Sequence, residues 1–83
     1  MVTAENSDEI KLIPNPVSDE LTITSQSELS KIEIINLFGE VVFRKELSNF
    51  RYQLSSNNLR NGIYIIKAFT GKEIFQKKLI VNH

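Results

Sequence analysis

The chain has 83 residues, of which 41% are hydrophobic and 24% are charged, and its formal net charge is zero. This length allows one domain, and the composition is that of a globular protein and excludes an intrinsically disordered chain. The absence of cysteine excludes a disulfide framework and a thiolate metal site. No apolar run approaches the roughly 18 residues that cross a bilayer, so we expect no insertion into a membrane.

Charge is unevenly distributed along the chain. Residues 1–30 hold six acidic residues and one lysine, whereas residues 31–83 hold nine basic residues and four glutamates. The basic residues are scattered among apolar ones, and no basic run is longer than Lys77–Lys78. A nucleic-acid interface needs clustered basic residues together with exposed aromatic ones. We therefore interpret these residues as solvated strand faces and expect no nucleic-acid partner.

The first nine residues, MVTAENSDE, are small, polar and acidic, and show no periodicity. This is typical of a linker or a frayed terminus, so we predict a linker over residues 1–9 and a folded domain over residues 10–83. Near the start of that domain, LIPNPVSDELTI places Pro14 and Pro16 on either side of Asn15. Each proline lacks a backbone N–H and fixes φ at roughly −65°, so this segment is a stiff corner and neither helix interior nor central strand.

From Ile10 onward, short β-rich runs follow at intervals of about ten residues, separated by turn residues. These seven runs are IKLI (10–13), ELTITS (20–25), KIEIINL (31–37), EVVFRKEL (40–47), FRYQL (50–54), GIYIIKAFT (62–70) and EIFQKKLIVN (73–82). The pattern predicts an all-β fold, an immunoglobulin-like β-sandwich of about seven antiparallel strands.

Alternation of apolar and polar residues predicts which side chains face the core. Leu21 and Ile23 share one face of their run, and Ile32 and Ile34 share one face of the next. The phase breaks after Ile34, which suggests a bulge or burial on both faces. The run GIYIIKAFT is apolar on both faces apart from one lysine, so we predict a central strand covered on both sides. Most of the aromatic side chains are predicted to point inward.

Turn residues support the same architecture. Gly39 and Gly71 each lie between two runs, where a positive φ permits a tight antiparallel turn. Gly62 follows a loop and begins the predicted central strand.

The sequence offers little for catalysis. His83 is the one imidazole and stands last in the sequence, where we expect it to fray. Adjacent carboxylates such as Asp19–Glu20 point to opposite faces of a strand, so they do not converge on one bond. There is no phosphate loop and no calcium loop. We therefore predict a non-catalytic module with no catalytic residue, no metal site and no cofactor.

Four segments stand in order along the chain: PNPVSDELTI, KIEIINLFGEVV, LRNGIYIIKAFTGKE and KKLIVNH. Together, over about residues 12–81, they resemble the type A C-terminal sorting domain of the type IX (Por) secretion system of Bacteroidetes-type bacteria. The resemblance implies an immunoglobulin-like fold and a secretion signal. Such domains lead an attached cargo, for example a protease, an adhesin or a glycan-degrading enzyme, from the periplasm across the outer membrane to the cell surface or the medium.

The resemblance also implies partners. These are type IX translocon components in the periplasm and outer membrane, a surface sortase that usually removes the domain, and a covalently attached N-terminal cargo. The candidate residues for translocon recognition are those of the matching motifs, namely Pro14, Asn15, Pro16, Gly39, Gly62, Tyr64, Gly71, Lys77, Lys78, Leu79 and Val81. Among them Lys77, Lys78 and the final strand are the expected direct contacts, whereas the prolines, the glycines and Tyr64 are expected to act through the shape they maintain. We expect a monomer, although an unpaired edge strand gives a route to a dimer.

An alternative from another functional class stays open. The chain could be an immunoglobulin-like or fibronectin-like spacer, or a carbohydrate-binding module of a surface enzyme. A sugar-binding platform needs exposed aromatic side chains, whereas the alternation places most of them inward.

Overall fold

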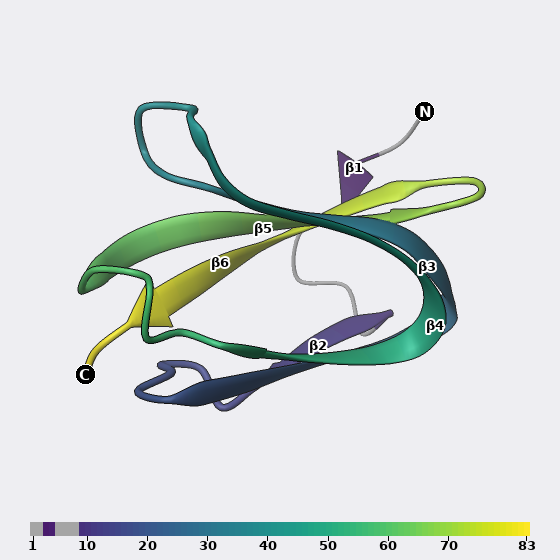
Figure 1. The fold of residues 1–83 in the computed structure, drawn as a ribbon. Coiled ribbons are helices and arrows are strands. Elements are labelled where there is room, and N and C mark those ends of the chain that lie inside the picture. The colour runs from purple at the N-terminus through teal and green to yellow at the C-terminus, as the bar shows by residue number, and fades with distance from the viewer. Residues whose placement is uncertain (1–2, 5–8) are drawn as a thin grey trace.

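The computed structural model describes residues 3–4 and 9–83, and the regular structure in them consists of strands. The strands are β1 (Thr3–Ala4), β2 (Ile10–Ile13), β3 (Glu20–Ile35), β4 (Val41–Ser55), β5 (Gly62–Thr70) and β6 (Ile74–Val81). They form one sheet in the order β1-β6-β5-β3-β2, with β4 paired to β3 (Figure 1). Neighbouring strands are antiparallel, apart from β1, which runs parallel to β6. The predicted all-β, antiparallel class is confirmed.

β3 and β4 are long strands that belong to both halves of the sheet. The first part of β3 pairs with β2, from Thr22 to Ser25, and its last part pairs with β5, from Leu29 to Ile35. β4 follows β3 along both parts, and the register between them shifts after Thr24, where the strands bend (Figure 1). The sheet therefore curls, and the half that contains β2 lies opposite the half that contains β5 and β6.

The predicted seven runs correspond to a smaller number of strands. Two pairs of runs merge, one pair across residues 26–30 into β3 and the other across residues 48–49 into β4. Neither connecting segment contains a glycine or a proline that would end a strand. The backbone therefore stays extended and bends, and one curled sheet results where a sandwich of separate sheets was predicted.

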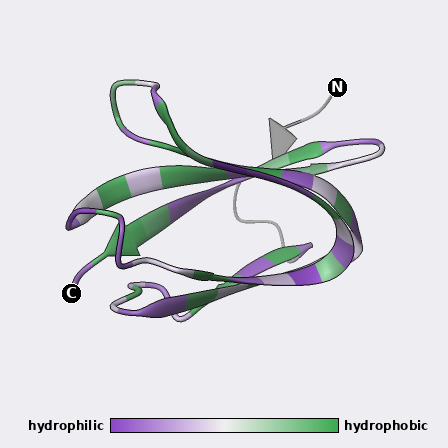
Figure 2. Cartoon of the chain, in the orientation of Figure 1, coloured by the Kyte–Doolittle hydropathy of each residue, from purple (hydrophilic) through white to green (hydrophobic). Residues whose placement is uncertain are grey.

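The core lies between the facing halves of the curled sheet. It consists of Ile10, Val17, Leu21, Ile23, Leu29, Ile32, Ile34, Leu54, Leu59, Tyr64, Ile66, Ala68, Phe75, Leu79 and Val81. Apolar and polar residues alternate along the strands (Figure 2), as period-two burial requires. The predicted inward pairs Leu21 and Ile23, and Ile32 and Ile34, are fully buried. The predicted bulge is confirmed as a register irregularity between Ile34 and Ile35.

β5 is covered on one face only, which corrects the prediction of burial on both. Tyr64, Ile66 and Ala68 are buried, whereas Ile63 is 43% exposed and Ile65 is partly exposed. The inward face packs into the core, but no second layer of the described chain covers the outer face. The apolar run GIYIIKAFT therefore correctly predicted that β5 lies in the middle of the sheet, but it did not predict that only one face of β5 is covered.

The aromatic side chains do not all point inward. Tyr64 and Phe75 are buried, but Phe38 is 90% exposed and Phe50 is 51% exposed. Phe43, Tyr52 and Phe69 are partly buried. Phe43 and Tyr52 pack against the core, so most of the aromatic side chains face inward as predicted. The exceptions are Phe38 in the β3–β4 turn and Phe50 on an edge strand.

The glycines play different parts in the turns. Gly39 has a φ of 86° in the β3–β4 turn, as predicted, and Gly62 has a φ of 157° at the start of β5. Gly71 has no positive φ, so that prediction is wrong. In its turn the hydroxyl oxygen of Thr70 accepts hydrogen bonds from the N–H groups of Lys72 and Glu73. These bonds hold the turn without a left-handed residue.

Of the predicted linker, residues 1–9, the structure describes residues 3, 4 and 9. Thr3 and Ala4 pair with Ile74 and Phe75 of β6, and the rest of the predicted linker lies outside the described residues.

Candidate functional site

The Pro14–Pro16 corner lies against the last strand. Both prolines follow cis peptide bonds, Ile13–Pro14 and Asn15–Pro16. The Asn15 side chain between them forms two hydrogen bonds with the backbone of β6. Its Nδ2 donates to the carbonyl oxygen of Lys78 at 2.9 Å, and its Oδ1 accepts from the N–H of Ile80 at 3.0 Å. The Asn15 side chain thus forms the two hydrogen bonds with β6 that the backbone of a neighbouring strand would otherwise form.

Val17 continues this contact by one more step along β6. Its N–H donates to the carbonyl oxygen of Ile80 at 2.8 Å, and its carbonyl oxygen accepts from the N–H of Asn82 at 2.8 Å. These bonds form a parallel bridge between Val17 and Val81, and the Val17 side chain is fully buried. The corner and Val17 together satisfy backbone groups of an edge that would otherwise be open to pairing with another chain.

The structure brings most of the candidate recognition residues together. In the pairing of β5 with β6, Gly62 lies opposite Val81 and Tyr64 lies opposite Leu79. Gly62 and Tyr64 are therefore next to the part of β6 that the corner covers. Tyr64 is fixed by its hydroxyl, which donates to the carbonyl oxygen of Arg60 at 2.7 Å. We name this assembly the corner site; it comprises Pro14, Asn15, Pro16, Gly62, Tyr64, Lys78, Leu79 and Val81.

The remaining candidates lie elsewhere. Gly39 is in the β3–β4 turn, and Gly71 is in the β5–β6 turn, at the other end of β5 from Gly62. Lys77 is half-buried beside the inward-facing residues of β6, whereas Lys78 is exposed. Of the two lysines, Lys78 is therefore the more available to a partner.

His83 is held in place, which overturns the expectation that it frays. Its backbone N–H donates to Oδ1 of Asn61 at 2.9 Å. Both ring nitrogens lie 2.7 Å from carbonyl oxygens, Nε2 from that of Leu59 and Nδ1 from that of Ser18. Two acceptors favour the ring with both nitrogens protonated, so the Leu59 carbonyl, and then the Ser18 carbonyl, raise the pKa of His83 above its ordinary value of 6.5.

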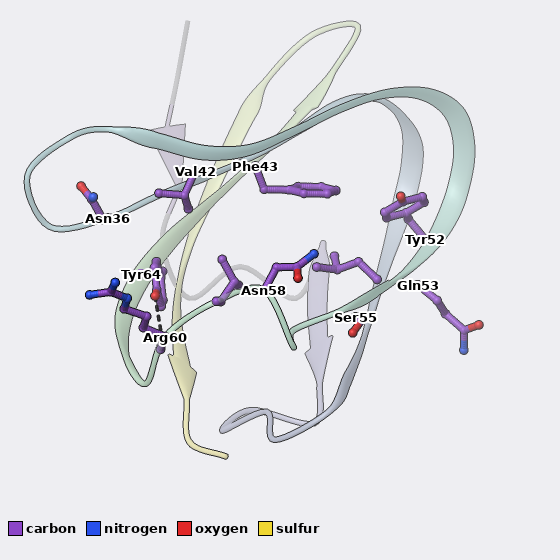
Figure 3. Close-up of a pocket in the computed structure, with 11 residues that line it drawn as sticks. Asn36, Val42, Phe43, Tyr52, Gln53, Ser55, Asn58, Arg60 and Tyr64 are labelled. Atoms are coloured by element: carbon purple, nitrogen blue, oxygen red, sulfur yellow. Dashed lines mark hydrogen bonds between the residues drawn. The ribbon is translucent and has the colours of Figure 1, made fainter.

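A cavity of about 620 Å³ opens between the two arms of β4 (Figure 3). Its lining residues are Asn36, Val42, Phe43, Tyr52, Gln53, Leu54, Ser55, Asn58, Leu59, Arg60 and Tyr64. Phe43 and Tyr52 lie with their ring centroids 6.4 Å apart. Among the described residues, the lining contains no carboxylate, histidine or lysine. In the part of the chain that the structure describes, no three histidine or acidic side chains are placed to hold a metal ion, and no helix could cross a membrane.

Residues 11–82 match the family described as the secretion system C-terminal sorting domain. The chain belongs to this family. Its members are the C-terminal sorting signals of the type IX secretion system.

A curated relative fits the same assignment. Beta-agarase D of Zobellia galactanivorans is 34% identical to the sorting domain over 76 residues. The alignment takes in 89% of this chain but only 15% of that protein. Beta-agarase D is thus similar to this chain over a small part of its length, as expected of a sorting domain carried by a larger protein, and its bacterial group fits the family.

The sequence did not indicate several residues that shape the sorting domain. The roles of Val17 and Ile80 depend on backbone hydrogen bonds, which leave no mark in the side-chain pattern. The position of His83 depends on carbonyl oxygens of two loops, around Ser18 and Leu59.

Proposed function

We propose that this domain is a non-catalytic signal that directs an attached cargo across the outer membrane through the type IX machinery. The family match over residues 11–82 carries the proposal. In transit the domain is recognised in the periplasm by translocon components of the periplasm and outer membrane. At the surface a sortase then cleaves it from the cargo, which stays at the cell surface or is released.

The corner site supports recognition of the folded domain. Lys78 is an exposed residue of β6, and its backbone carbonyl accepts a hydrogen bond from the Asn15 side chain. A charged side chain on a fixed backbone loses little conformational freedom when a partner binds. We propose that the translocon recognises the shape of this corner and the charge of Lys78.

We propose the kind of cargo from the similarity to beta-agarase D. Beta-agarase D carries a matching segment over 15% of its length. A secreted polysaccharide-degrading enzyme is therefore a suitable cargo for this domain.

An export assay tests the proposal. Residues 1–83 are fused behind a signal peptide and a fluorescent cargo in a bacterium with a working type IX system. We expect the cargo outside the cells, with the domain removed by a cut near residues 2–9. If the intact fusion stays in the periplasm, the sorting function is wrong.

Two variants then separate folding from recognition. Deleting residues 79–83 removes Ile80, the partner of Asn15, together with His83, so we expect the cargo to remain in the periplasm. Lys77→Glu combined with Lys78→Glu reverses the local charge. Because Lys77 is half-buried, an unchanged midpoint of urea unfolding is required to show that this variant still folds. Normal export of this charge-reversed variant would show that the lysines are not a contact.

The alternative, a carbohydrate-binding module, is favoured by one observation, the exposure of Phe38 and Phe50. These rings belong to the β3–β4 turn and to the middle of β4, so they do not lie next to each other along the strand. Titration of the domain with agar oligosaccharides, followed by isothermal calorimetry, distinguishes the alternatives. Heat of binding that disappears in Phe38→Ser would support the module.

A further inference from the structure

The β3–β4 turn presents apolar side chains to solvent. Leu37 is 69% exposed, Phe38 90%, Val41 45% and Val42 42%. We name these four residues the apolar tip. Single exposed apolar residues are ordinary, but several that adjoin one another mark an interaction surface. Because these side chains bury so little area in the domain, their apolar character is not explained by the core.

The apolar tip stands on a rigid turn. Oδ1 of Asn36 accepts hydrogen bonds from the N–H groups of Phe38 and Glu40 at 2.9 and 3.0 Å, and its Nδ2 donates to Oε1 of Glu40 at 2.9 Å. The backbone of Asn36 also bonds Glu40 and Gly39. The turn rises away from β5 after the last pair of the two strands, Ile35 with Ile65 (Figure 1). A preorganised apolar side chain binds with a smaller entropy cost than one on a mobile loop.

Charge around the tip indicates the kind of partner. Glu40 is the one charged residue among residues 36–43. Two basic residues lie near the base of the turn. Arg44 donates from Nε to the Glu33 carboxylate at 3.0 Å, and Arg60 of the β4–β5 loop lines the cavity together with Asn36 and Val42. An apolar loop that enters an anionic lipid surface is normally accompanied by lysine or arginine. A tip with a single acidic residue instead complements an apolar protein pocket with a basic rim.

We propose that the apolar tip is a second docking contact of the domain, inserted into an apolar pocket with a basic rim on a protein of the secretion machinery. This inference rests on the proposed sorting function. It assigns a role to Leu37 and Phe38 that is separate from the corner site.

A competition experiment tests the tip. A reporter strain exports the fluorescent cargo fused to residues 1–83, and free domain is produced in the periplasm as competitor. Wild-type competitor should reduce export of the reporter. Leu37→Ser combined with Phe38→Ser should weaken this competition by about tenfold, as loss of an aromatic anchor does. Phe50→Ser, which removes an exposed aromatic ring from the middle of β4, is the matched control and should compete like wild type.

Two further measurements test whether weaker competition comes from the apolar tip itself. Unfolding of each variant in urea should show an unchanged midpoint, because the altered side chains are exposed. Glu40→Gln keeps an acceptor for Nδ2 of Asn36 and removes the charge, so weaker competition by this variant would support a basic rim. Equal competition by the Leu37/Phe38 variant and wild type would overturn the proposal while the export of the reporter leaves the sorting function intact.

A vesicle-binding assay tests whether the apolar tip instead contacts a membrane. Wild-type domain is mixed with sedimenting vesicles of phosphatidylethanolamine and phosphatidylglycerol. We expect it to stay in the supernatant. Sedimentation of the wild type but not of the Leu37/Phe38 variant would overturn the protein pocket in favour of a membrane contact.

Discussion

Asn15 accepts a hydrogen bond at 3.0 Å from the backbone N–H of Ile80, a residue 65 positions later in the chain. The same amide donates to the carbonyl oxygen of Lys78. A single side chain thereby joins the entry of the domain to its last strand. The corner would lose its fixed position on β6 if this amide were replaced.

Asn15→Asp tests the two bonds separately. The carboxylate still accepts from Ile80, but it can no longer donate to Lys78 and instead faces a carbonyl oxygen. We expect a loss of about 1–2 kcal/mol in the free energy of unfolding, and a similar loss for Asn15→Ala. Urea unfolding measures both. Glu28→Ala, at an exposed position of β3, is the control, and an equal effect there would show that the amide bonds do not stabilise the fold.

Gly39→Ala should strain the β3–β4 turn. With a φ of 86° and no heavy atom within 4 Å of an added Cβ, the cost comes from the backbone alone. We expect about 1–2 kcal/mol of destabilisation. Gly71→Ala, which also meets nothing within 4 Å and has no positive φ, should change stability by less than about 0.5 kcal/mol. Thermal unfolding followed by circular dichroism compares the two, and equal midpoints would remove the backbone argument.

Ile66→Ala should be severe. The side chain is fully buried in β5, and truncation of a buried isoleucine costs about 2–5 kcal/mol. A domain of this size is expected to have a stability on the order of 3–5 kcal/mol, so the variant should be largely unfolded at 25 °C or close to it. Ile63→Ala, at a position 43% exposed on the same strand, should cost less than about 1 kcal/mol. Amide exchange monitored by NMR would reveal the difference, and comparable protection in the two variants would contradict the one-sided burial of β5.

Stability should respond to the protonation of His83. The carbonyls of Leu59 and Ser18 raise its pKa above 6.5, so the folded state binds the proton more tightly than the unfolded state. The stabilising contribution is therefore fully present below the unfolded value and is lost as pH rises through the folded value. NMR titration of the ring should give a higher pKa in the folded protein than in urea. His83→Gln removes this titration and should flatten the difference in unfolding midpoint between about pH 5.5 and about pH 8.5; the same difference in both proteins would exclude a role for the ring.

Local patterns in the sequence determined much of the fold. Alternation placed Leu21, Ile23, Ile32 and Ile34 in the core, because successive side chains of a strand point to opposite faces. Gly39 marked a turn because glycine adopts a positive φ without steric cost. The order of four motifs also indicated the family, which the match over residues 11–82 then showed.

Only the tertiary structure decided how these parts meet. Whether the Asn15 amide would face solvent or the edge of β6 depends on the order of strands in the sheet, which places a segment near residue 15 beside one near residue 80. The two carbonyl oxygens at the His83 ring belong to Ser18 and Leu59, which flank the paired ends of β3 and β4, and the place of β6 in the sheet brings His83 to them. The seven runs became long bent strands for the same reason: local residue preferences fix backbone conformation over a few positions, whereas pairing across the sheet decides where a strand continues.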